Sequence, residues 1–77
     1  MIYAQFYGKS AISDELIEGC GDRSVFVLDG RNTLRTQIAD AKAWGARHGW
    51  LAFKIYKGDT FTRSRPISSL QYMGVQQ

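Results

Sequence analysis

The sequence is poor in three residue types on which small domains and enzyme sites often depend. It holds one cysteine (Cys20), one proline (Pro66) and one histidine (His48) among its 77 residues. A single cysteine excludes a disulfide within the chain, and a cysteine-based zinc site would need at least one more sulfur. These scarcities predict a domain without a metal or a cofactor, held together by its own core.

Long apolar runs are also missing. No stretch approaches the roughly 20 apolar residues that span a bilayer, and the start MIYAQFYGKS lacks the basic and then apolar pattern of a signal peptide. We therefore expect a cytoplasmic protein that makes no membrane contact. With 44% hydrophobic and 22% charged residues, the composition is that of a globular protein. We expect one small domain over residues 1–77, with the last few residues frayed.

The segment 50–65, WLAFKIYKGDTFTRSR, has the alternation of two strands joined by a tight turn. Gly58-Asp59 suits a two-residue hairpin turn, because glycine tolerates the positive φ that such turns require. The predicted turn sets the register of the hairpin. It pairs Lys57 with Thr60, Tyr56 with Phe61, Lys54 with Arg63 and Ala52 with Arg65.

This hairpin would sort its side chains by face, since alternate residues of a strand point to opposite sides. Leu51, Phe53 and Ile55 lie on one side and form an apolar surface. The other side is cationic and aromatic, and it carries Trp50, Lys54, Tyr56, Phe61, Arg63 and Arg65.

Two further strands and a short helix are predicted in the N-terminal half. Residues 2–7 alternate, with Ile2, Ala4 and Phe6 on one side and the tyrosines at 3 and 7 on the other. Residues 24–28, SVFVL, form a β-branched and aromatic run typical of a buried strand. Residues 13–19 indicate a short helix, because Ser13 can cap it and Gly19 can end it.

The long helix is predicted from about Thr33 to His48. Asn32 or Thr33 can cap its start, and Gly49 stands where a left-handed residue closes many helices. Gly45 falls on its apolar stripe, which predicts a close crossing over the sheet. The apolar stripe comprises Leu34, Ile38, Ala41, Trp44, Gly45 and His48.

The predicted order is therefore strand, helix, strand, helix, strand, strand. We expect an α+β fold with a small antiparallel or mixed sheet of three or four strands. The long helix would cover one face and leave the cationic, aromatic side of the hairpin open. Pro66 would end the last strand or lie at an edge, because proline donates no ladder hydrogen bond.

No catalytic constellation accompanies these elements. Cys20 and His48 could act as nucleophile and base only if the fold brought them together, and no local signature supports that pairing. Asp14, Glu15 and Glu18 fit the solvated face of a short helix better than a pair of catalytic carboxylates. Phosphate-loop, single-stranded RNA and helix-turn-helix signatures are absent.

The cationic, aromatic face predicts binding. Tyrosine, tryptophan and arginine dominate protein-binding hot spots, and the net charge of +3 favours a partner with an acidic surface. We expect a non-enzymatic regulator or inhibitor of a larger protein, of the size and type common among phage and mobile-element accessory proteins. The alternative is a nucleic-acid module using the same face, with rings stacked on bases. A sheet edge could also pair two copies into a homodimer, although Pro66 and nearby charges favour a protected edge.

Overall fold

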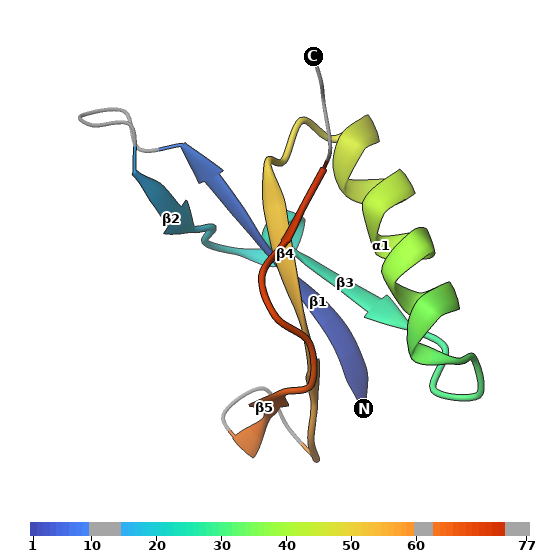
Figure 1. The fold of residues 1–77 in the computed structure, drawn as a ribbon. Coiled ribbons are helices and arrows are strands. Elements are labelled where there is room, and N and C mark those ends of the chain that lie inside the picture. The colour runs from blue at the N-terminus through green and yellow to red at the C-terminus, as the bar shows by residue number, and fades with distance from the viewer. Residues whose placement is uncertain (10–14, 60–62, 74–77) are drawn as a thin grey trace.

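The computed structural model describes residues 1–9, 15–59 and 63–73, apart from the side chain of Asp22. These residues form one α-helix and a six-stranded antiparallel sheet, in keeping with the predicted α+β class (Figure 1). The elements are, in chain order, β1 (Ile2–Lys9), β2 (Leu16–Glu18), a 3-10 turn (Asp22–Ser24), β3 (Val25–Leu28), α1 (Leu34–Arg47), β4 (Ala52–Lys57), β5 (Arg65–Pro66) and β6 (Gln71–Tyr72).

Strand β1 lies at the centre of the sheet. β4 pairs along one side of it, while β3 and β2 follow one another along the other side. On its far side β4 pairs with β5 and β6. At each edge of the sheet, two short strands therefore follow one another along the same neighbouring strand. Because β3 and β4 both run antiparallel to β1, they are parallel to each other, and α1 makes the crossover that parallel strands require.

The core lies between α1 and one face of the sheet. Phe6, Phe53 and Ile55 are fully buried there, together with the small side chains of Ala4 and Ala41. Burying an aromatic or branched side chain of this size stabilises a fold by about 1.5–3 kcal/mol. The predicted inward side of residues 2–7 is thus confirmed. Leu51 was predicted to point inward beside Phe53, but it precedes β4 and is 44% exposed.

Local signals determine the ends of α1. Thr33 caps it, since its Oγ1 accepts a hydrogen bond from the Thr36 N–H at 3.3 Å. Gly49 follows the helix with a φ of +82°, a conformation that glycine adopts without strain. Gly45 lies against the sheet so closely that a Cβ there would meet the Phe6 ring and the Met73 methyl group. All three predictions for this helix are confirmed.

The prediction of a short helix over residues 13–19 is wrong. Leu16–Glu18 form β2, which pairs with Lys9, Gly8 and Tyr7. Two turns of helix gain few hydrogen bonds for the entropy they cost, whereas β1 offers a complete row of backbone partners. Ser13 and Asp14 lie outside the described residues. The sheet accordingly has six strands instead of three or four.

The predicted hairpin register is also wrong. Lys57 pairs with Arg65 and Tyr56 with Pro66, so a two-residue turn at Gly58-Asp59 does not set the register. Thr60 and Phe61, predicted to pair with Lys57 and Tyr56, lie outside the described residues. The chain after Pro66 explains this shift. The Ile67 N–H donates to the Ile55 carbonyl at 2.7 Å, and the Ile55 N–H donates to Ser68 Oγ at 3.0 Å. This pairing, continued by β6, fixes the register of the C-terminal segment, and Pro66 ends β5 as predicted.

Helix α1 is the one α-helix of the described residues, and it is neither long nor apolar enough to cross a membrane.

Candidate binding face

Three tyrosines lie on the face of the sheet opposite α1. Strand alternation turns Tyr3, Gln5 and Tyr7 of β1 to this side, and the register sets Tyr56, Lys54 and Ala52 of β4 directly beside them. Val27, Val25 and Glu18 continue the same rows on β3 and β2. We call this surface the tyrosine face. Figure 1 shows α1 packed along one side of the sheet.

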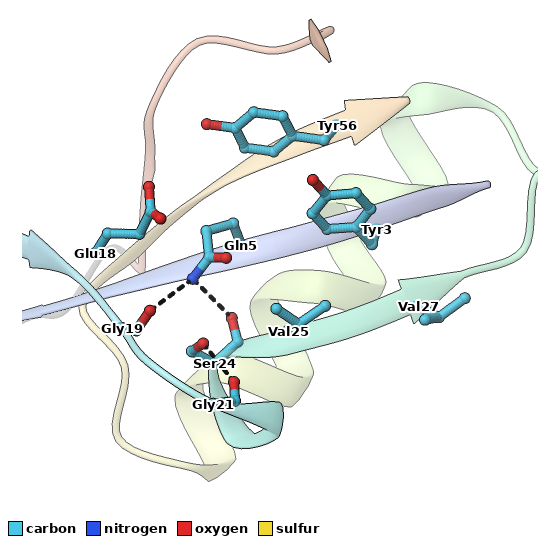
Figure 2. A pocket seen from close by; sticks show the side chains of 9 residues that line it. All are labelled: Tyr3, Gln5, Glu18, Gly19, Gly21, Ser24, Val25, Val27 and Tyr56. Atoms are coloured by element: carbon cyan, nitrogen blue, oxygen red, sulfur yellow. Dashed lines mark hydrogen bonds between the residues drawn. The ribbon is translucent and has the colours of Figure 1, made fainter. Parts of the chain in front are cut away.

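The tyrosine face is hollowed into a groove of about 590 Å³. Figure 2 shows the side chains that surround it, which come from β1, β2, β3 and β4 and from the loop between β2 and β3. Strands therefore hold most of the groove, and strands position side chains more firmly than loops do. The groove is lined by Tyr3, Gln5, Glu18, Gly19, Gly21, Ser24, Val25, Val27 and Tyr56.

Two tyrosines form a wall of the groove. The rings of Tyr3 and Tyr56 stack across the β1–β4 ladder, with centroids 5.4 Å apart and planes 8° from parallel. Tyr3 is only 5% exposed, so its ring is held in place by its surroundings. An aromatic pair of this kind contributes about 0.5–1.5 kcal/mol beyond the area that it buries. Tyr56 is half-buried and is the accessible ring of the pair, so a partner would meet a ring that Tyr3 holds in place from beside it.

Tyr7 links this wall to a carboxylate. Burial, followed by hydrogen bonding and charge interactions with Tyr56 and Glu18, raises the pKa of Tyr7 well above its ordinary value of 10.0. The Tyr7 hydroxyl is therefore neutral at physiological pH. The face carries tyrosine hydroxyls beside one carboxylate, which is a set suited to hydrogen bonding.

Gln5 closes the break between β2 and β3. Its Nε2 donates to the carbonyl oxygens of Gly19 and Ser24, both at 3.3 Å, where the edge strand leaves β1 (Figure 2). Ser24 is buried, and its hydroxyl donates to the Gly21 carbonyl at 2.8 Å. These hydrogen bonds satisfy backbone carbonyls that the interrupted ladder leaves without a strand partner. The loop at the end of the groove is thus fixed by side chains.

The predicted binding residues do not form one surface. Lys54 and Tyr56 lie on the tyrosine face, as expected. Trp50 precedes β4, so the alternation does not extend to it. Its ring packs beside Phe6 on the core side, with centroids 6.2 Å apart, and its Nε1 donates to the Arg23 carbonyl.

The predicted arginines are displaced by the change of register. Arg65 stands opposite Lys57, and strand alternation places that pair on the side of Phe53 and Ile55. Arg63 is exposed in the connection before β5. Phe61 lies outside the described residues. The cationic character expected of the face therefore rests on Lys54, while its aromatic character is carried by the tyrosines.

Sequence reasoning missed Tyr3, Tyr7 and the two valines as members of this site. A signal was present, because the alternation of residues 2–7 already turned both tyrosines away from the core. What the sequence did not give was the pairing of β1 with β4, which brings Tyr3 against Tyr56.

The residues considered for catalysis do not assemble. Cys20 is exposed, and His48 caps α1 with its ring against Trp44, their centroids 4.2 Å apart. No hydrogen bond joins the two among the described residues. Within the same residues, no three histidine, cysteine or acidic side chains gather closely enough to hold a metal ion.

Comparison of the chain with protein-family models, curated proteins and solved structures finds no match.

Proposed function

We propose that this protein is a non-enzymatic protein-binding module that takes a segment of a larger partner into the groove of its tyrosine face. The observation that carries the proposal is the groove itself, of about 590 Å³ and walled by the stacked Tyr3 and Tyr56 rings. Tyrosine is enriched among residues that dominate binding energy, because it offers a rigid ring and a hydrogen-bonding tip.

The lining of the groove favours protein over nucleic acid. Among the described residues, the lining includes the carboxylate of Glu18 and contains no lysine or arginine. A nucleic-acid site relies on cations to hold phosphates, and a carboxylate beside the stacking rings opposes them. Lys54, on the same face, and the net charge of +3 support an approach by a partner with an acidic surface.

No catalytic group is assembled among the described residues, so a domain of this size would act by occupying its partner. We infer a stoichiometric regulator or inhibitor that covers a surface of its partner, of the kind found among phage and mobile-element accessory proteins. Its effect would be to make the covered surface of the partner inaccessible to other molecules, without any chemical reaction in the groove.

The test uses one pair of matched charge reversals and one ring deletion. Lys54→Glu changes the tyrosine face, while Lys42→Glu makes the same change on an exposed position of α1. Tyr56→Ala removes one ring of the stack. Tagged protein is used to capture partners from the native host, and the affinity of each purified partner is then measured by calorimetry. We expect Lys54→Glu and Tyr56→Ala each to weaken binding by about tenfold or more, which is ~1.4 kcal/mol, and Lys42→Glu to bind as the wild type does.

Circular dichroism melts establish that each variant is folded. Equal binding by Lys54→Glu, Tyr56→Ala and the wild type would remove the tyrosine face from consideration. Oligonucleotide gel shifts at low salt test the alternative. A shift that Lys54→Glu abolishes and Lys42→Glu retains would favour the nucleic-acid function instead, with a steep dependence on salt.

A further inference from the structure

Strand β3 has one open side. Among the described strands it pairs with β1 alone, so the backbone groups on its other side have no strand partner. Its residues, Val25–Leu28, include no charge and no proline, and Val27 is 58% exposed. Proteins usually protect an edge strand with charged residues or proline. The opposite edge of this sheet has that protection in Arg65 and Pro66, whereas β3 does not.

A second hollow, of about 370 Å³, lies between this edge and the helix. Phe26 and Trp44 both line it, with their rings stacked at a centroid distance of 5.1 Å. The groove of the tyrosine face borders β3 from the other side of the sheet through Val25 and Val27. A strand added to this edge would direct alternate side chains to the two sides, and each set would find a hollow.

The helix side of this hollow has a regular charge pattern. Asp40, Ala43, Trp44 and Arg47 line it, at the spacing that places residues along one stripe of a helix. Asp40 and Arg47 therefore lie at opposite ends of the stripe, with Ala43 and Trp44 between them. Neither Asp40 nor Arg47 makes an ion pair within the described part of the chain, and both are exposed.

This pattern is complementary to itself. If two copies met about a two-fold axis through the middle of the stripe, the acidic end of each helix would face the basic end of the other. An isologous interface has this property, since residue i meets residue j and j meets i. An unrelated peptide strand would have no reason to require the symmetry.

We propose that β3 pairs antiparallel with β3 of a second copy, about a two-fold axis at Val27, and that Asp40 of each copy pairs with Arg47 of the other. An axis normal to the sheet keeps both helices on one face and sets Val27 opposite Val27 of the second copy. The shared sheet would be continuous across the two copies. The inference does not depend on the partner proposed for the tyrosine face.

The dimer would be concentration-dependent. β3 has four residues, and specific stable interfaces usually bury about 1,200–2,000 Å² in total. Sedimentation equilibrium over micromolar to millimolar protein therefore measures the association. We expect Asp40→Arg and Arg47→Asp each to weaken it by about tenfold or more, because each places two pairs of like charges across the axis.

A charge-swap experiment gives the sharper test. An equal mixture of Asp40→Arg and Arg47→Asp restores opposite charges at both contacts, so it should form a heterodimer with near wild-type affinity. The double variant, with both changes in one chain, should self-associate in the same way. Lys42→Glu on α1 is the control and should dimerise as the wild type does. Val27→Asp sets two carboxylates together at the axis and should give a monomer that circular dichroism shows to be folded.

Three results would overturn the inference. The first is a wild-type protein that stays monomeric throughout the concentration range. The second is a dimer that neither charge reversal nor Val27→Asp weakens. The third is a pair of monomeric reversal variants that fail to recover when mixed. Lys54→Glu should dimerise as the wild type does, because Lys54 lies on the tyrosine face and not at the β3 edge. A failed dimer test therefore leaves the proposed function intact, and a failed partner-binding test leaves the dimer intact.

Discussion

At the scale of single residues, Tyr7 shows how the tyrosine face is held together. Its hydroxyl interacts with Tyr56 and Glu18, and burial and these contacts favour the protonated form. A group whose pKa is raised by folding binds its proton more tightly in the folded state than in the unfolded chain. The free energy from this preference is fully present below the unfolded pKa and is lost as the pH rises through the folded pKa.

We predict that the stability of the wild-type protein falls as the pH rises above 10, the ordinary pKa of tyrosine, and that Tyr7 contributes to this loss. Tyr7→Phe has no proton to lose at this position. The variant should therefore be less stable than the wild type at neutral pH, by about 0.5–1.5 kcal/mol for the lost hydrogen bonds. Its deficit should shrink in alkaline solution. Urea unfolding on both sides of pH 10 measures the two curves.

Tyr72→Phe is the matched control for that experiment. Tyr72 is 60% exposed, and its hydroxyl makes no hydrogen bond within the described residues. The control curve should run parallel to that of the wild type. A constant gap between Tyr7→Phe and the wild type across the whole pH range would show that the Tyr7 proton has no part in folding stability.

At the scale of the element, α1 lies against the sheet at a glycine. A Cβ at Gly45 would overlap the fully buried Phe6 ring as well as the Met73 methyl group. Met73 could move, because a methionine side chain is flexible. Phe6 is packed among core residues and has little room to adjust. The glycine thus sets the distance between helix and sheet.

We predict that Gly45→Ala destabilises the protein. Alanine gains about 1 kcal/mol of helix propensity over glycine, but overpacking a core typically costs about 1–3 kcal/mol. The difference of these two terms is a net loss of up to about 2 kcal/mol in the free energy of unfolding, measured in denaturant. Gly30→Ala is the control. A Cβ there meets only the Ile2 Cδ1 at 3.6 Å, an ordinary contact, so its effect should stay within about 0.5 kcal/mol. A stabilised Gly45→Ala variant would show that the helix can move away from the sheet.

Elements differ in how far their own residues determine them. α1 could be predicted because Thr33 caps it, Gly49 closes it and its apolar stripe repeats, all within the segment itself. β2 could not be predicted, because Leu16–Glu18 are a strand only through their pairing with β1. The register of β5 depends on contacts made by Ile67 and Ser68, which lie beyond the predicted turn. Local signals predicted the helix and the three longer strands, whereas long-range pairing decided β2 and the register of β5.

The candidate site follows the same division. The sequence placed Lys54 and Tyr56 on one face and Tyr3 and Tyr7 away from the core. These two predictions concern different strands, and neither says that the strands are neighbours. Only the pairing of β1 with β4 combines them into one surface, and only the loop held by Gln5 makes that surface a groove. Trp50 lies on the core side because it precedes β4, where the alternation of the strand no longer determines the direction of a side chain.

At the scale of the whole molecule, the sheet has a firm centre and short outer strands. β1 and β4 each have strand partners on both sides, and the core is packed on them. β2, β5 and β6 are two or three residues long and have a partner on one side only among the described strands. Local opening is cheapest where few contacts must break.

We predict that native-state hydrogen exchange divides the sheet accordingly. Amides of β1 and β4, around Phe6 and Phe53, should exchange only on global unfolding. Amides of β2 and β6 that bond to a neighbouring strand should exchange orders of magnitude faster, since local openings cost from near zero up to the global free energy. Exchange measured by NMR at low protein concentration, with and without mild denaturant, separates the two classes.

Equal protection in β6 and β1 would contradict the division, and it would mean that the C-terminal segment unfolds only together with the core. The tyrosine face would then be equally rigid as far as β6, where Tyr72 stands opposite Ala52 of that face.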